Sequence, residues 1–284
     1  MATALLDGIP TRYEVVGSGA PLLMFSPGGF DATLEKWSTL GAYARTRPME
    51  HLPKHYSCVV FDRRECGQSG GRVEIVTWGH YVAQGMALLD HLRIDRAHFM
   101  GGCMGCSPVI AAAVAHPARV ASMILYWPVG GARYRIKGRQ RFDEHLDFVR
   151  QHGLEAVVVL VAKDGKAFGA DPRVGPWASL IRRDPDFASA YVRHDRQAYE
   201  RIVAGMAQAL LDRDTAPGAE PEALLRLEIP ALIVPGHDES HATSAARYLE
   251  ECLPRSQYWD VPVDAQTEQA AAPRMLQFLE GAKP

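Results

Sequence analysis

The sequence predicts an α/β fold in which a mostly parallel central sheet is flanked by helices and interrupted by a helical insertion. Short apolar runs of strand type alternate with amphipathic stretches in the N-terminal half, and this alternation returns near the C-terminus. Between these parts, residues 130–221 are richer in charge and helix formers and show little strand pattern. We therefore expect a core made of residues 1–129 and 222–284, with a helical cap at 130–221.

The predicted elements follow in chain order. Strands are expected at 22–26, 58–61, 97–100 and 121–127, with helices at 81–92 and 108–116 between them. Gly153, Asp171-Pro172 and Pro185 predict breaks within the insertion. A strand at 231–234, a helix at 244–252, a strand at 256–263 and a helix at 271–280 complete the core.

The composition narrows the class of protein. The 284 residues are 47% hydrophobic and 23% charged, which is typical of a globular protein with a sizeable core. A net charge of -2 gives no electrostatic case for nucleic-acid binding. The sequence begins without signal-peptide features, and no apolar run approaches the roughly 18 residues that span a bilayer. Five cysteines without a secretion signal indicate free thiols. We expect a cytoplasmic protein that acts on a small molecule, binds neither nucleic acid nor membranes, and is compatible with homo-oligomers.

The most specific motif is the stretch Phe99-Met100-Gly101-Gly102-Cys103-Met104-Gly105-Cys106. An apolar run ends in small-x-Cys-x-small and a helix-type run follows, which is the pattern of a nucleophile elbow with cysteine in place of serine. The glycines allow a sharp, strained turn to close. Cys103 would then lie at a helix N-terminus, where the dipole and free N–H groups favour the thiolate. Cys103 and Cys106 also form a C-x-x-C, but no second pair accompanies it, so a redox or metal site is less favoured.

The chain resembles the α/β-hydrolase family over nearly its whole length. Four stretches in the family's order carry the resemblance. The first is Ser26-Pro27-Gly28-Gly29-Phe30, where the family has an oxyanion-hole loop, and the second is Asp62-Arg63-Arg64-Glu65-Cys66-Gly67-Gln68-Ser69, in which Glu65 replaces a usual glycine. The third is the elbow at Cys103, and the fourth is Ile229-Pro230-Ala231-Leu232-Ile233-Val234-Pro235-Gly236-His237-Asp238. The insertion falls where the family's cap domain does. The resemblance implies an α/β-hydrolase fold whose chemistry is carried by side chains, with no metal or organic cofactor.

The resemblance also implies roles for individual residues. Cys103 is the candidate nucleophile, which would form an acyl-enzyme. The backbone N–H groups of Met104 and Gly29 are the candidate oxyanion donors, with Phe30 as the alternative to Gly29. Asp238 is the candidate acid that orients a histidine, and Glu239 is its alternative.

The chain departs from the family at the base. The family places a histidine after the last strand, near residues 263–266, yet no histidine follows His241. His241, three residues beyond Asp238, is the favoured base. His237 and a mechanism without a strong base remain open, and His80 is a more distant alternative. Asp264 and Gln266 occupy the vacated loop, where contact with substrate or water is one interpretation.

The expected function is hydrolysis of a small ester, lactone or thioester through a Cys103 acyl-enzyme. One alternative is hydrolysis of a C–C bond in a diketone-like substrate, which the same family also supports. Another is a ligand-binding or sensing protein with little turnover, which the missing C-terminal histidine supports. The basic stretch from Arg133 to Arg141 is either a solvated surface or a region that attracts an anionic substrate such as a carboxylate.

Overall fold

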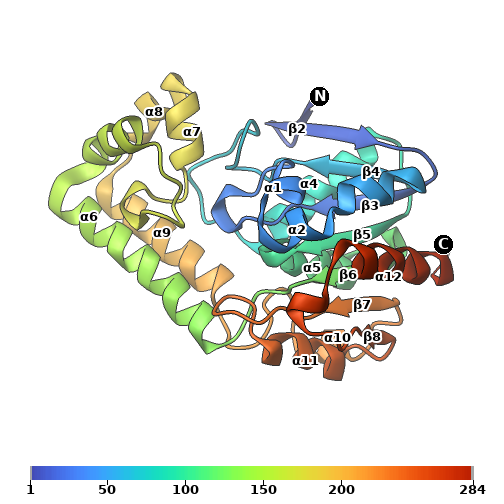
Figure 1. Cartoon of the computed structure of the whole chain (residues 1–284). Coiled ribbons are helices and arrows are strands. Elements are labelled where there is room, and N and C mark those ends of the chain that lie inside the picture. The colour runs from blue at the N-terminus through green and yellow to red at the C-terminus, as the bar shows by residue number, and fades with distance from the viewer. Residues whose placement is uncertain (1, 283–284) are drawn as a thin grey trace.

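The computed structural model describes residues 2–282 and confirms the predicted α/β fold. Its centre is an eight-stranded sheet with the order β1-β2-β4-β3-β5-β6-β7-β8 (Figure 1). The neighbouring pairs from β4 to β8 are parallel, whereas β2 pairs antiparallel with both β1 and β4. The strands are β1 (Ala2–Leu6), β2 (Ile9–Val16), β3 (Ala20–Phe25), β4 (Tyr56–Phe61), β5 (Ala97–Gly102), β6 (Val120–Tyr126), β7 (Ala231–Val234) and β8 (Ser256–Tyr258).

Helices cover both faces of the sheet. The helices outside the insertion are α1 (Lys36–Thr39), α2 (Gly41–Thr46), α3 (Pro48–His51), α4 (Trp78–His91), α5 (Cys106–Ala115), α10 (Pro221–Leu224), α11 (Thr243–Cys252) and α12 (Glu268–Gly281). Alternate side chains of a strand point to opposite faces. In β3, Leu23 and Phe25 therefore pack with α4, α5 and α11, whereas Leu22 and Met24 pack with α1, α2 and α12.

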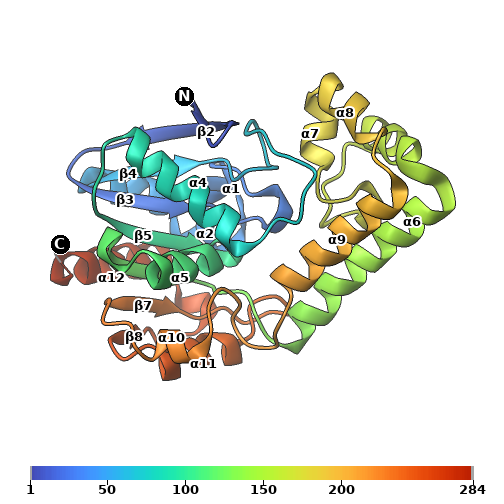
Figure 2. The same cartoon turned by 180° about the vertical axis from the view of Figure 1, so that it is seen from behind.

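The insertion is helical, as its composition predicts. It contains α6 (Ala132–Asp164), α7 (Ala178–Arg183), α8 (Pro185–Tyr191) and α9 (Arg196–Leu210). Figures 1 and 2 show these helices grouped beside the sheet rather than on either of its faces. They share a buried cluster that includes Phe142, Trp177 and Tyr199. The predicted breaks are present, because Gly153 interrupts α6 with a φ of 81° and Pro185 begins α8.

Two elements differ from the expectation. The strand expected at 256–263 ends at Tyr258, and a short 3₁₀ turn occupies Val263–Ala265. β8 lies at the edge of the sheet, and Pro262 has no N–H to continue a ladder. The β1–β2 hairpin was not expected. Its turn contains Asp7 and Gly8 with φ of 49° and 69°, and an Asp-Gly pair between apolar alternations is the signal that predicts such a hairpin.

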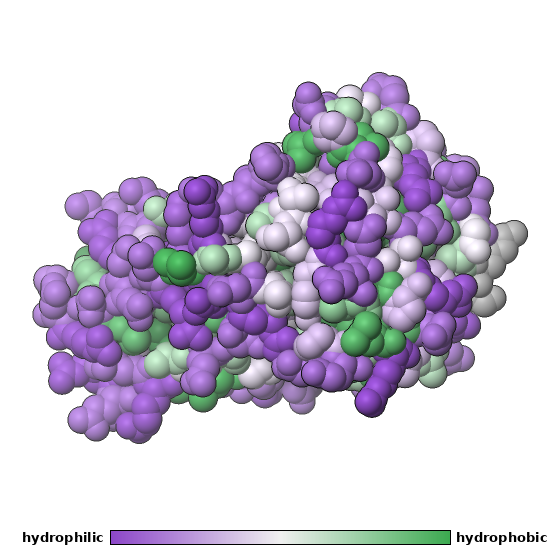
Figure 3. Space-filling model, turned by 90° about the horizontal axis from the view of Figure 1, so that it is seen from below, coloured by the Kyte–Doolittle hydropathy of each residue, from purple (hydrophilic) through white to green (hydrophobic). Residues whose placement is uncertain are grey.

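The face of the molecule drawn in Figure 3 is predominantly polar. In the view of Figure 3 the hydrophobic residues form small, separate patches among hydrophilic ones. Within residues 2–282, no helix has the length and apolar character needed to cross a bilayer. Most of the larger hydrophobic side chains lie in the three buried clusters between the helices and the sheet and within the insertion.

Candidate active site

Cys103 lies in the sharp turn between β5 and α5. It has a φ of 54°, in the left-handed region that L-residues rarely occupy. The flanking glycines are required, since a Cβ on Gly101 would collide with the backbone of Gly105 and Cys106, and a Cβ on Gly105 would collide with the carbonyl of Phe25. The turn therefore has the predicted elbow geometry and projects the Cys103 side chain at the start of a helix.

Asp238 and His241 form a hydrogen-bonded pair on the loop after β7. Nδ1 of His241 lies 2.8 Å and 2.9 Å from the two carboxylate oxygens of Asp238. The same carboxylate accepts hydrogen bonds from the backbone N–H groups of Ser240 and His241 at 2.8 Å and 3.0 Å. Because Nδ1 binds Asp238, Nε2 is the ring atom available for proton transfer.

Cys103 and His241 influence each other's ionisation. Burial lowers the pKa of His241, but the charge of the Cys103 thiolate and the hydrogen bond to Asp238 outweigh burial and raise it to about 10. Burial raises the pKa of Cys103, but the charge of His241 and the N–H groups of Met104 and Gly28 outweigh burial and lower it. The hydrogen bond from His241 lowers the pKa of Asp238 to about 2. These shifts favour a thiolate–imidazolium pair at neutral pH.

The Nε2 atom of His241 makes no hydrogen bond of ordinary geometry to another described residue. Charge is the larger part of its interaction with the Cys103 sulfur, and a smaller hydrogen-bond contribution between the two groups adds to it. An unengaged Nε2 beside the sulfur is free to exchange a proton with a bound substrate.

The position of His241 is set by long-range contacts. Its ring packs against the indole of Trp127, with centroids 5.4 Å apart. The backbone bridges to Gly130, whose N–H donates to the carbonyl of Ser240 at 3.0 Å. A Cβ on Gly236 would collide with the Cβ of His241 and closely approach the indole of Trp127. The segment after β6, which carries Trp127 and Gly130, thus supports the loop after β7.

Gln266 occupies the loop where the family places its histidine, and it has a structural role here. Its side chain is buried and accepts a hydrogen bond from Nε1 of Trp127 at 2.8 Å. Its amide donates to the carbonyls of Pro235 and Val261 at 2.8 Å and 3.2 Å. Gln266 is not among the residues that line the pocket at Cys103. It instead holds Trp127, the residue against which His241 packs.

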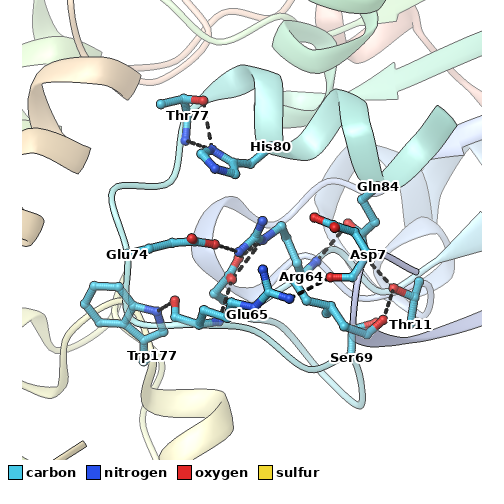
Figure 4. Close-up of polar contacts among 12 residues, drawn as sticks. Asp7, Thr11, Arg64, Glu65, Ser69, Glu74, Thr77, His80, Gln84 and Trp177 are labelled. Atoms are coloured by element: carbon cyan, nitrogen blue, oxygen red, sulfur yellow. Dashed lines mark hydrogen bonds and ion pairs between the residues drawn. The ribbon is translucent and has the colours of Figure 1, made fainter. Parts of the chain in front are cut away.

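The other candidate bases and acids lie away from Cys103. His237 is exposed, contacts the hydroxyl of Thr243 at 3.2 Å, and faces a separate hollow of about 690 Å³ that Asp264 also lines. His80 caps the start of α4, and Figure 4 shows its ring directed toward Thr77. Glu239 is exposed and forms ion pairs with Lys137 and Arg133.

The loop predicted to supply oxyanion donors lies beside Cys103. The N–H groups of Met104 and Gly28 face the sulfur, and the Gly28 contact was not anticipated. Gly28 and Gly29 have φ of 117° and 60°, so a glycine-rich sequence is needed for this loop conformation. The donor role of Gly29 or Phe30 toward a substrate oxygen stays a prediction.

Cys103 and His241 line a cavity of about 280 Å³. Met104 and the Gly28–Phe30 loop line the cavity from the core side, and Tyr134, Arg141 and Phe168 line it from the insertion. The rings of Phe30, Phe142 and Phe168 pack edge to face, with centroids 5.1–5.4 Å apart. This aromatic cluster joins the Gly28–Phe30 loop to the insertion, and the small cavity suits a small, partly apolar ligand.

The structure separates the members of the basic stretch. Arg133 and Lys137 pair with Glu239, Arg135 pairs with Asp214, and Arg139 donates to the carbonyl of Leu211 at 3.0 Å. Arg141 lines the cavity and has no acidic partner within residues 2–282. Most of the stretch is thus the solvated surface that was one of the two interpretations, whereas Arg141 faces the site.

The remaining cysteines are buried away from the cavity. Cys106 donates its S–H to the carbonyl of Gly101, 3.1 Å away, and burial raises its pKa well above the ordinary value. Cys58 and Cys252 are core residues. Among residues 2–282, no group of three or more His, Cys, Asp or Glu side chains is arranged to hold a metal ion.

A family model described as the alpha/beta hydrolase fold matches residues 21–164. The chain belongs to the α/β-hydrolase fold family. The hydrolase is 27% identical over 83% of its length to a protein named putative non-heme haloperoxidase from a Mycobacterium phage, of which 77% is covered. It is 24% identical over 86% of its length to 3-oxoadipate enol-lactonase 2 of Acinetobacter baylyi, of which 81% is covered.

Solved structures show the same fold. A meta-cleavage product hydrolase from Pseudomonas fluorescens matches with a TM-score of 0.61 and 22% identity, covering 100% of this chain and 98% of the other. An enol-lactonase from Burkholderia xenovorans matches with a TM-score of 0.61 and 21% identity, covering 98% of this chain and 100% of the other. At these identities the likeness establishes the fold alone.

Proposed function

We propose that this hydrolase cleaves a small ester, lactone or thioester through an acyl-enzyme on Cys103. The observation that carries the proposal is the array of Asp238, His241 and Cys103, in which Asp238 binds His241 while His241 and Cys103 line the same cavity, with the sulfur on the turn that precedes α5. A nucleophile, a base and an orienting acid in this relation are the components of nucleophilic acyl transfer.

In the acylation step, the Cys103 thiolate attacks the carbonyl carbon and the carbonyl electron pair moves onto oxygen. In this proposal, backbone N–H groups at Met104 and in the Gly28–Phe30 loop stabilise that oxyanion, which is supported by the position of these residues beside Cys103. His241, as imidazolium, gives its Nε2 proton to the departing oxygen or sulfur as the bond to the leaving group breaks.

In the deacylation step, neutral His241 accepts a proton from water as the water oxygen attacks the thioester carbon. The bond between that carbon and the sulfur of Cys103 then breaks, which releases the acid and restores the thiolate and imidazolium. Asp238 keeps the imidazole in the tautomer with Nε2 free and stabilises its charged form.

We further propose that residues 130–221 act as a cap that closes the pocket. Support comes from Tyr134, Gly138 and Arg141 on α6 and from Phe168, all of which line the same cavity as Cys103. The cavity volume of about 280 Å³ supports a small substrate. The position of Arg141 supports a substrate with a negative charge at the end remote from the reacting carbonyl.

The test is intact-mass spectrometry after brief exposure to a panel of activated esters and thioesters. We expect a transient acyl adduct on the wild type and on Cys252→Ala, a matched control at a buried cysteine remote from the pocket. We expect no adduct and no turnover in Cys103→Ala with its fold intact. Full activity in Cys103→Ala would contradict the mechanism.

The alternatives predict different products. C–C bond hydrolysis yields an acid and a ketone rather than an acid and an alcohol or thiol, so product analysis distinguishes it. A binding protein predicts retention of ligand without product. The missing C-terminal histidine supported that alternative, and the placement of His241 beside Cys103 weakens this support.

A further inference from the structure

Arg63 is a buried cation next to the candidate active site. It follows β4 and is only 2% exposed. Its Nε and Nη1 atoms have no hydrogen-bond partner among the described residues. A guanidinium stays protonated in proteins, and burying its N–H groups without partners is costly. A buried polar group left in this state needs an explanation.

The contacts of Arg63 reach both segments that surround Cys103. Its Nη2 atom donates a hydrogen bond to the carbonyl of Gly29 and lies 3.8 Å from the sulfur of Met104. The guanidinium also lies over the ring of Tyr81, 4.3 Å from its centroid. Arg63 therefore joins the oxyanion loop to the residue that follows the nucleophile.

Its neighbours leave the charge of Arg63 largely uncompensated. Glu65 is the carboxylate that interacts with it, but Nε of Arg64 already donates to that carboxylate at 2.9 Å (Figure 4). Burial also raises the pKa of Glu65 to about 7, so this group is partly neutral at physiological pH.

The other groups that face Arg63 are neutral side chains and the nucleophile. Burial raises the pKa of the Cys66 thiol to about 12, and the pKa values of the phenols of Tyr81, which is buried, and Tyr134, which is half-buried, are also raised. Cys103 is the remaining group, and it is the one that forms an anion at neutral pH in the proposed mechanism. The electrostatic effect of Arg63 is thus directed at the reacting sulfur.

We propose that Arg63 is a positioning residue that holds the Gly28–Gly29 loop against the nucleophile and stabilises negative charge on the sulfur and on the tetrahedral intermediate. The bond from Nη2 to the Gly29 carbonyl fixes the Gly29–Phe30 peptide, which lies in the same loop as Gly28, whose N–H faces Cys103. An unpaired cation in a low-dielectric interior acts strongly on a nearby developing anion. The inference rests on the proposed role of Cys103 as nucleophile.

The experiment measures the rate of Cys103 alkylation by a neutral haloacetamide across pH, using intact-mass detection on the full chain. Arg63→Met and Arg63→Gln remove the charge, whereas Arg63→Lys keeps the charge but lacks the planar guanidinium that donates several hydrogen bonds. Arg183→Met is the matched control. Arg183 also donates to backbone carbonyls of the turn after β4, at Gly67 and Ser69, but its charge is not coupled to Cys103.

We expect the thiol pKa to rise by about one unit or more in Arg63→Met and Arg63→Gln, because an adjacent cation has been removed. In Arg63→Lys we expect a thiol pKa near that of the wild type but a kcat at least about tenfold lower, because an ammonium does not span Gly29 and Met104. Arg183→Met should change neither quantity.

An unchanged thiol pKa and kcat in a folded Arg63→Met or Arg63→Gln variant would overturn the inference. If neither neutral variant folds, Arg63→Lys decides, since a wild-type kcat there would overturn it. Failure of the proposed function has a separate signature. In that case the wild-type thiol itself would alkylate with an ordinary pKa and would form no acyl adduct.

Discussion

Replacement of His241 by glutamine tests the thiolate–imidazolium pair directly. In the wild type, the charge of His241 is the largest influence that lowers the pKa of Cys103, and it acts against the effect of burial. Glutamine is polar but cannot carry the charge. Burial then dominates, and we expect the thiol pKa to lie above its ordinary value of 9.0.

The size of the effect follows from the ionised fraction. A thiol with a pKa of 9.0 is about 1% thiolate at pH 7, and a higher pKa leaves less. The thiolate of a weaker acid is intrinsically more nucleophilic, which recovers part of the loss. We expect alkylation of Cys103 at pH 7 to fall by at least about tenfold in His241→Gln. The deficit relative to the wild type should vanish at a pH high enough to ionise the thiol in both proteins.

The assay is the pH dependence of alkylation by a neutral haloacetamide, followed by intact mass. His237→Gln is the matched control, because His237 lies on the same loop but contacts Thr243 instead of Cys103. The catalysed reaction should also slow above about pH 10, where His241 loses the proton that it gives to the leaving group. A folded His241→Gln variant that alkylates at the wild-type rate at pH 7 would refute this pairing.

Three further outcomes are expected. Gln266→Ala should lower the free energy of unfolding by about 1–3 kcal/mol, since it leaves the buried hydrogen-bond partners of Gln266 unsatisfied. It should also lower kcat, because Trp127 no longer holds His241. An unchanged kcat in a variant that resists urea would contradict this. Burial raises the pKa of Glu65 to about 7 from an ordinary 4.5, so its stabilising contribution is complete below pH 4.5 and is lost as pH rises through 7. Urea titrations should therefore show wild-type stability falling over this range by up to about 3 kcal/mol, and Glu65→Gln should flatten that slope. Arg141→Gln should reduce the preference for a carboxylate-bearing ester over a neutral ester, measured as the ratio of their kcat/KM values, by about tenfold. Arg133→Gln should not change this ratio, because Arg133 pairs with Glu239. An equal ratio in the wild type and both variants would contradict the proposed charge recognition.

Local patterns were sufficient to predict most of the core. The strand at Ala231–Val234 and the breaks at Gly153 and Pro185 agree with the structure because backbone geometry depends on a few adjacent residues. The prediction extended the edge strand β8 too far, because the length over which this strand hydrogen-bonds is limited by the neighbouring strand β7 and by Pro262. The β1–β2 hairpin was missed although Asp7-Gly8 indicates its turn.

The sequence by itself determined the α/β architecture, the elbow at Cys103 and the proximity of Asp238 to His241, because each depends on residues close together in the chain. Only the tertiary structure decided which histidine faces the sulfur, that Gln266 holds Trp127 instead of lining the cavity, and that Arg63 and Arg141 lie at the site. These placements bring together segments that are distant in the sequence; Cys103 and His241, for example, are more than a hundred residues apart. They result from packing and charge interactions between strand ends, which no local periodicity encodes.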